Sequence, residues 1–285
     1  MLKQMKMRTK IIGALATVVV LSLAAAGIGY YGMSSVMRAQ EEISAVRLPG
    51  IQSLSTINQA QKAVLVGERG LVNRRMLDSE IRKAQYAYID NAWKEIDAAW
   101  KVYEAFPKTS EEKEVWKSFI GQWDVYKNES RRVVDLSIEK DKMLASGVGL
   151  DDPKMKEHDD KVFQTSLDSR KAFLASSASL NKLTEINAGV AKEQAAQADA
   201  TASTVRGILL GVIVLSAALS ILFGFLLSRN VTDIINSLLK EATDLTTAAL
   251  QGRLNVRGDL EKVNFEFRGI VEGFNKTLDA VIGPL

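Results

Sequence analysis

The sequence contains no cysteine, only four prolines and a single histidine among 285 residues. Without cysteine there is no disulfide framework and no thiolate metal site. Few prolines, and no sustained alternation of β-branched or aromatic residues with polar ones, leave helix as the expected state for nearly the whole chain. Basic and acidic residues number 37 and 34, so the net charge of +3 gives no broad footprint for nucleic acid. We therefore predict an all-α protein.

Catalytic signatures are also missing. The only histidine, His158, lies in the charged run Lys154 to Lys161, which is interpreted as a solvated helix face. Gly147-Val148-Gly149 is not followed by Gly-Lys-Ser/Thr and has no strand before it, so it is interpreted as a loop and not as a phosphate-binding turn. Acidic residues are common, but none forms a recognisable acid–base pair. We predict no catalytic residue, no metal site and no cofactor.

Two long stretches without charge are predicted to be membrane-spanning helices, residues 11–32 and 207–228. The second holds about 22 residues, enough to cross a hydrocarbon layer of about 30 Å. Residues 1–10 carry Lys3, Lys6, Arg8 and Lys10 and no acid, which places the N-terminus in the cytoplasm, and two spans return the C-terminus there. A cleavable signal peptide is the alternative for the first stretch, since the run Leu23-Ala24-Ala25-Ala26-Gly27 contains the small residues that a signal peptidase accepts; the length of the stretch favours a span.

The segment between the spans, residues 33–206, divides at turn signals into four predicted helices. Breaks are expected at Leu77-Asp78-Ser79, at Pro107, and at the loop from Ser146 to Pro153. Thr109 and Glu112 stand at the spacing of a capping box that starts the third helix. The fourth helix has no strong breaker before Arg206 and leads into the second span. These features predict an extracytoplasmic up-down four-helix bundle.

The second and third of these helices share an aromatic heptad pattern. The positions lie three, four and three residues apart in each helix: Trp93, Ile96, Trp100 and Tyr103, then Trp116, Phe119, Trp123 and Tyr126. A fold at Pro107 brings the two sets face to face as core layers. The alternative for these residues is an aromatic ligand cage.

The first bundle helix carries polar residues along its apolar seam. Asn58 and Gln61 occupy positions where a bundle favours apolar side chains, and Arg69, Arg74 and Arg170 are candidates to lie nearby. Arginines can hold a carboxylate by paired hydrogen bonds. The five residues are the predicted ligand site, for a small molecule that carries a carboxylate. A solvated face with a polar homodimer seam is the alternative.

Residues 229–285 form two short amphipathic segments joined by a connector that begins at Gly252. Apolar residues recur at helical spacing on both sides of the connector. Two short helices cannot bury such stripes alone, so we expect a second copy to complete a parallel four-helix bundle.

Arg229 leads the first of these segments, Gly252-x-Leu254 starts the connector, and Phe274-Asn275 follow Glu266 by eight and nine residues. In these residues the segment resembles a HAMP domain, and the chain as a whole is similar to the sensor half of a bacterial methyl-accepting chemotaxis receptor. Ile234 replaces a usual proline of the family, and Phe265 and Arg268 replace its usual aspartate and glycine. The resemblance implies a homodimer in the bacterial inner membrane. The residues proposed for signal coupling are Arg229, Ile235, Gly252, Leu254, Val256, Glu266, Phe274 and Asn275.

The resemblance implies a transmembrane chemoreceptor that is not an enzyme. Family members act in receptor arrays and control a histidine kinase through an adaptor, using a further cytoplasmic coiled coil that we expect beyond residue 285. The input half of a histidine kinase or of a diguanylate cyclase is the rival, and a structural membrane bundle without a ligand is another. The sequence that follows residue 285 distinguishes a chemoreceptor from the input half of an enzyme.

Overall fold

The computed structural model describes residues 5–282, so Lys3 and the last three residues of the predicted 229–285 segment lie outside it. All regular elements in this part of the chain are helices, as predicted. They are α1 (Met7–Glu41), η2 (Glu42–Arg47), α2 (Leu48–Val72), α3 (Ser79–Ala105), α4 (Ser110–Ala145), α5 (Pro153–Leu250), η3 (Leu260–Lys262), η4 (Phe265–Phe267) and α6 (Arg268–Ile282). The chain forms two compact units, residues 35–201 and residues 5–34 with 202–282.

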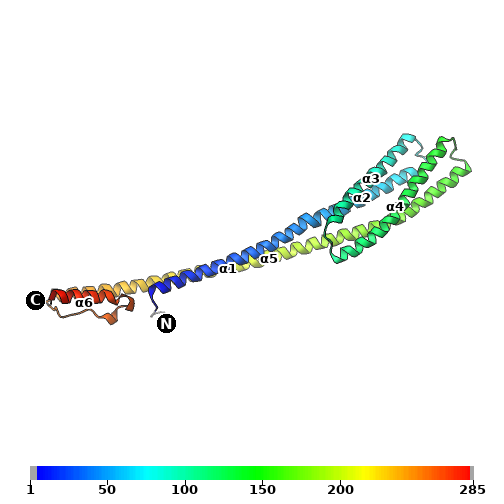
Figure 1. The fold of residues 1–285 in the computed structure, drawn as a ribbon. Helices are drawn as coiled ribbons and strands as arrows, with labels where there is room; N and C mark the ends of the chain where they lie inside the picture. The colour runs from blue at the N-terminus through cyan, green and yellow to red at the C-terminus, as the bar shows by residue number, and fades with distance from the viewer. Residues whose placement is uncertain (1–4, 283–285) are drawn as a thin grey trace. The chain divides into compact units, whose positions relative to one another are not determined.

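The first unit is a bundle of α2, α3, α4 and the first half of α5, which lie side by side (Figure 1). Asp78 caps α3 by accepting hydrogen bonds from the Glu80 and Ile81 N–H groups at 2.9 and 3.0 Å. The predicted capping box is present at the start of α4, where Thr109 and Glu112 bond each other's backbone N–H groups. Gly147 ends α4 with a φ of 87°, a conformation that glycine adopts at little cost.

A π-helical segment, Glu42–Arg47, joins α1 to α2, and Pro49 is the second residue of α2. The sequence predicts a bend at Pro49, because its ring clashes with the carbonyl four residues earlier and it donates no hydrogen bond. The wider π-turn gives the chain another way past the proline without ending the helix. It also brings Arg47 to a buried position, 5% exposed.

The aromatic heptads form the core of the bundle, as predicted. Phe119 and Tyr126 are fully buried, and Trp116 and Trp123 are nearly so. Ring centroids of neighbouring layers are about 5 Å apart, for example 4.6 Å between Trp100 and Trp116. Trp93 and Trp100 differ from these residues, since they pack against the core but remain partly exposed.

Close approach of α2 to α3 depends on Gly67. A Cβ atom built on Gly67 would lie 2.4 Å from Ile89 Cγ1, whereas one built on exposed Gly121 would meet nothing within 4 Å. We expect Gly121→Ala to raise the free energy of unfolding by about 0.5–1 kcal/mol through helix propensity. Gly67→Ala should lower it by about 1–3 kcal/mol through overpacking. Denaturant titration checks both, and equal signs would contradict the packing described here.

The second unit contains the two predicted spans. The described helices include two that are long and apolar enough to cross a membrane, and their most apolar windows are almost wholly exposed. A Cβ built on Gly32 would lie 2.4 Å from Val205, so α1 and α5 pack closely there. Large side chains such as Val20, Leu23, Val214 and Ile221 stay exposed, as a lipid-facing surface requires.

At its C-terminal end the second unit contains a helix pair, which consists of the C-terminal part of α5 and the whole of α6. Gly252 ends α5 at φ 75°, and Arg253 N–H bonds the Ala248 carbonyl in the helix-ending pattern that glycine favours. The connector then runs through η3 and η4 to α6; Val263 of the connector and Val271 of α6 are both buried. Leu254 and Val256, the connector residues predicted from the sequence, are more than a third exposed, whereas Val263, which was not predicted, is the buried one.

Candidate functional site

Two of the predicted ligand residues lie in a polar cluster between α2 and α5. Gln61 is fully buried; Ser176 donates to its side-chain oxygen at 3.0 Å, and its own amide donates to Asn58. Asn58 also donates to Asn181 at 2.8 Å and accepts from Ser177. The buried polar groups of Gln61 are therefore satisfied within the chain, and the cluster fixes the register of α2 against α5.

The three predicted arginines lie elsewhere. Arg69 and Arg170 are exposed, and Arg74 pairs with Asp159 and donates to the Leu150 carbonyl. Arg74 follows Gln61 by 13 residues, about 20 Å along a helix, so it cannot share one small ligand with the amides. Within the single chain the five residues form no common site. A carboxylate site built from them stays a prediction.

A buried carboxyl that follows Asn58 and Gln61 on the same seam, but was not among the predicted ligand residues, lies one heptad beyond Gln61. Glu68 is fully buried in the bundle, and Ser169 of α5 donates to both of its carboxyl oxygens, at 2.9 and 3.2 Å. Burial raises the pKa of Glu68, although serine hydrogen bonds and the charge of Arg69 oppose the rise. In the sequence, the position of Glu68 on the apolar seam of this helix indicates that its carboxyl is buried.

The raised pKa of Glu68 predicts a pH dependence of stability. A carboxyl whose pKa is higher in the folded state favours folding most below its unfolded pKa, and this contribution is lost as pH rises through the folded pKa. Glu68→Gln removes the ionisation, so we expect it to raise the Tm by a few degrees at pH 8 and to have a smaller effect at pH 4. Exposed Glu95→Gln is the control. A stabilisation that is equal at both pH values would contradict the assignment.

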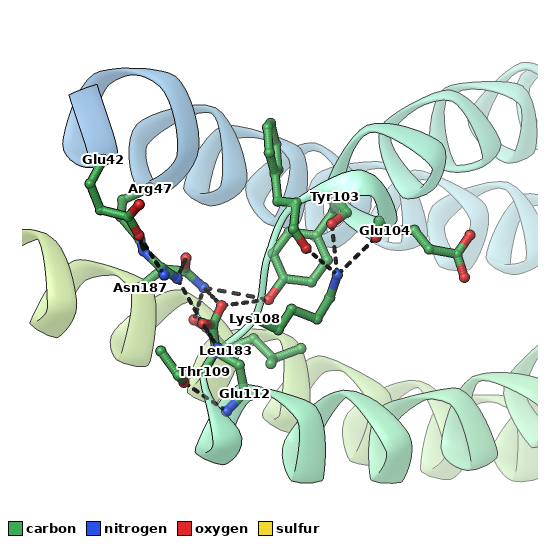
Figure 2. A network of polar contacts seen from close by, with 10 residues as sticks. Glu42, Arg47, Tyr103, Glu104, Lys108, Thr109, Glu112, Leu183 and Asn187 are labelled. Atoms are coloured by element: carbon green, nitrogen blue, oxygen red, sulfur yellow. Dashed lines mark hydrogen bonds and ion pairs between the residues drawn. The ribbon is translucent and has the colours of Figure 1, made fainter. Parts of the chain in front are cut away.

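A second polar network joins four elements at the end of the bundle that holds the α3–α4 turn (Figure 2). Its centre is the buried ion pair Arg47–Glu112, with 2.7 Å between Nη1 and Oε2. Asn187 of α5 donates to Glu112 at 2.6 Å, and Tyr103 of α3 donates to it at 3.1 Å. Glu42 pairs with Arg47 from the solvent side at 2.7 Å. We call these five residues the Arg47 network.

Charge in the Arg47 network is stabilised by these contacts. Burial acts to raise the pKa of Glu112, but the Thr109 N–H, Arg47 and Asn187 outweigh it, and the pKa falls below its usual value. Burial acts to lower the pKa of Arg47, but Glu112 and Glu42 raise it. Both groups therefore remain charged at neutral pH. The network connects the helix that follows α1 to α3, to α4 and to α5.

Hydrogen bonds hold the connector of the C-terminal helix pair to its two helices. Asn275 of α6 accepts from the Gly258 N–H at 2.7 Å and donates to the Gly258 carbonyl at 3.0 Å. Glu241 of α5, 5% exposed, accepts from the Asp259 N–H at 2.9 Å. Glu266 accepts from the Met7 N–H at the start of α1 at 2.7 Å. Two predicted coupling residues, Glu266 and Asn275, therefore have defined contacts.

The other predicted coupling residues line exposed surface or the helix end. Gly252 makes the turn that ends α5, and Arg229 is exposed. Four apolar members are more than a third exposed in the single chain: Ile235, Leu254, Val256 and Phe274. Apolar side chains on a helix pair that has no further cover provide a surface for another helix pair.

Comparison with known proteins identifies the first unit. The model of a four-helix-bundle sensory module for signal transduction, from methyl-accepting chemotaxis proteins, matches residues 4–202. The chain belongs to this family. It is therefore a chemoreceptor-type sensor for signal transduction, and the family confirms the four-helix bundle predicted from the sequence. No curated protein and no solved structure matches the chain.

Proposed function

We propose that this sensor is a transmembrane chemoreceptor that receives an extracytoplasmic signal in its helix bundle and relays it to a cytoplasmic output. The observation that carries the proposal is the extent of α5. This single helix, Pro153–Leu250, contains the fourth bundle helix, the second candidate span and the first helix of the C-terminal pair. A displacement or rotation in the bundle can therefore reach the C-terminal helix pair along one continuous helix.

The Arg47 network is the coupling site at the bundle end. Asn187 belongs to α5, and Arg47 belongs to the segment that follows α1, so the network ties both span-bearing helices to the α3–α4 turn. A ligand shifts the equilibrium between two packings of the bundle when it binds one packing more tightly than the other. The ion pair resists separation of Arg47 from α4, the Asn187–Glu112 hydrogen bond resists separation of α5 from α4, and together they favour rigid transmission over local bending.

The C-terminal pair acts as a HAMP domain when a second copy joins it. Its groove of about 360 Å³ is lined by small and apolar residues, including Ala242, Leu245, Phe274 and Leu278. A homodimer covers this groove and the exposed coupling residues. A histidine kinase and an adaptor bind a further cytoplasmic region beyond residue 285. The basic N-terminus lies in the cytoplasm, and two spans return residue 285 to the same side.

Charged substitutions in the connector test the HAMP proposal. Leu254→Asp or Val256→Asp is expected to abolish switching of the output, because a charge cannot enter the apolar seam of a four-helix bundle. Binding at the outer bundle should change little. The assay fuses residues 1–285 to the kinase-controlling region of a chemoreceptor and measures kinase activity and stimulus binding in membranes. Equal losses of binding and of output would count against the proposal.

A further inference from the structure

The π-helical segment η2 sets the helices on its two sides out of phase. The Leu48 N–H bonds the Ile43 carbonyl, five residues earlier, whereas an α-helical turn would use the carbonyl of Ser44. The wider turn therefore holds one extra residue, and one residue corresponds to a rotation of about 100° about a helix axis. The segment lies wholly within the bundle unit.

Burial along the chain shows this offset directly. After η2, buried residues follow a heptad seam at spacings of three and four: Arg47, Gly50, Leu54, Ile57, Gln61 and Val64. Before it, a seam of the same spacing contains two buried and three half-buried residues: Gly32 and Ala39, then Ser35, Glu42 and Val46. We call the second set the Gly32 seam. It ends at Val46 and the other begins at Arg47, so the two differ by one residue.

The ion pair between Glu42 and Arg47 belongs to the π-helical register. Residues five apart in an α-helix point about 140° away from each other, whereas a turn with one extra residue stacks them. The Nε and Nη2 atoms of Arg47 lie 2.9 and 2.7 Å from Oε1 of Glu42 (Figure 2). In an α-helical register Ile43 would take the place of Glu42 on this face. The ion pair therefore stabilises the wider turn.

A second seam on α1 is left partly exposed by the present register. It lies one residue after the Gly32 seam, and three of its four members are apolar: Met33, Val36, Gln40 and Ile43. We call it the Met33 seam. Met33 is 62% exposed, and Val36 and Ile43 are half-buried. An α-helical turn in η2 would rotate α1 by about 100° and bring the Met33 seam to the place of the Gly32 seam. Burial of apolar side chains favours that packing, and the ion pair favours the present one.

We propose that η2 is a switch between two packings of α1 that differ by one residue. In the first packing η2 keeps its wider turn, and the Glu42–Arg47 pair is formed. In the second packing η2 is α-helical, the pair is broken and the Met33 seam replaces the Gly32 seam. Two discrete packings of this kind turn a small change at one contact into a defined rotation. The inference goes beyond the proposed function, because it gives the first span a movement separate from that of α5.

Cysteine cross-linking of the full chain in membranes measures which seam faces α5, since the sequence has no cysteine of its own. A Cβ atom on Gly32 would lie 3.1 Å from the Cβ atom of Val205. This is near the separation of about 3.8 Å found in disulfides. Gly32→Cys with Val205→Cys therefore reports the first packing, and Met33→Cys with Val205→Cys reports the second. We expect both cross-links to form within one chain, the first one faster.

Two changes in and beside η2 then test the switch. Glu42→Ala removes the ion pair, so the ratio of the Met33 to the Gly32 cross-linking rate should rise by about threefold. Glu41→Ala is the matched control, because it removes an exposed carboxylate one residue away and should leave the ratio unchanged. Deletion of Ser44 removes the extra residue and makes the two seams continuous in an α-helix. The deletion should keep the Gly32 cross-link fast and cancel the effect of Glu42→Ala.

Two results would overturn the switch. One is an equal ratio in Glu42→Ala and Glu41→Ala. The other is loss of the Gly32 cross-link on deletion of Ser44, because that deletion rotates an ordinary α-helix by about 100°. Tryptophan emission from the bundle shows that each variant is folded. The cross-links need neither a ligand nor a kinase output, so a failure here is distinct from a failure of the proposed function.

Discussion

Replacing Arg47 by methionine is expected to lower the free energy of unfolding of the bundle by about 3–5 kcal/mol. Arg47 and Glu112 are 5% and 1% exposed, so removal of the guanidinium leaves a buried carboxylate without its cation. Asn187 and Tyr103 still donate to Glu112 but carry no charge to balance it. All four tryptophans lie in the bundle, so denaturant unfolding followed by tryptophan fluorescence measures this unit selectively.

Two variants sharpen the Arg47 test. Arg132→Met removes an exposed partner of Glu129 on α4 and should cost less than about 1 kcal/mol. The double variant Arg47→Met with Glu112→Gln should lose clearly less than the sum of the two single losses, because no unpaired charge remains. Additive losses, or an effect of Arg47→Met as small as that of Arg132→Met, would show that the ion pair is not a buried unit.

Replacing Asn275 by alanine is expected to release the connector from the helix pair. The Asn275 side chain bonds both the N–H and the carbonyl of Gly258, which is buried close to Val271. Leaving both backbone groups unpaired should cost about 2–3 kcal/mol locally. Amide hydrogen exchange at Gly258 should therefore quicken by about 30-fold or more. The kinase output of the fused receptor should stop responding to stimulus.

Asn264→Ala is the matched control for the connector. Asn264 also bonds a backbone N–H, that of Glu266, but the bond is exposed and local to the short helix η4. Exchange at Gly258 should not change in this variant. If Asn264→Ala and Asn275→Ala quicken exchange at Gly258 equally, the connector is loosely held and Asn275 does not fasten it.

Much of the fold follows from local signals in the sequence. The breaks at Asp78 and Pro107, the capping box at Thr109 and the glycine at position 147 mark helix ends because each satisfies or removes particular backbone hydrogen bonds. The aromatic heptads indicate the core because burial at that spacing needs only a turn at Pro107. Each of these signals depends only on residues close together in the sequence, so the sequence alone is enough to detect it.

The Arg47 network was harder to predict because its residues are distant from one another in sequence. Arg47 and Glu112 are 65 residues apart, and Asn187 is 75 residues beyond Glu112. Arg47 and Asn187 alone resemble ordinary polar residues of a solvated helix, and Glu112 was recognised only as a member of the capping box. The π-helical turn before Pro49 was also not predicted, since proline usually bends or ends a helix. Val263 was overlooked because the connector has no periodicity that marks an anchor.

The most direct test of the relay changes the phase of α5. One alanine inserted after Ala195 rotates everything beyond it by about 100° relative to the bundle, whereas four inserted residues restore the phase to within about 40°. In the fused receptor, the single insertion is expected to shift the baseline kinase activity strongly and the fourfold insertion to shift it less. An alanine inserted after Gly149, in the α4–α5 loop, should have no effect. If the single insertion in α5 also leaves the baseline unchanged, α5 does not carry the signal.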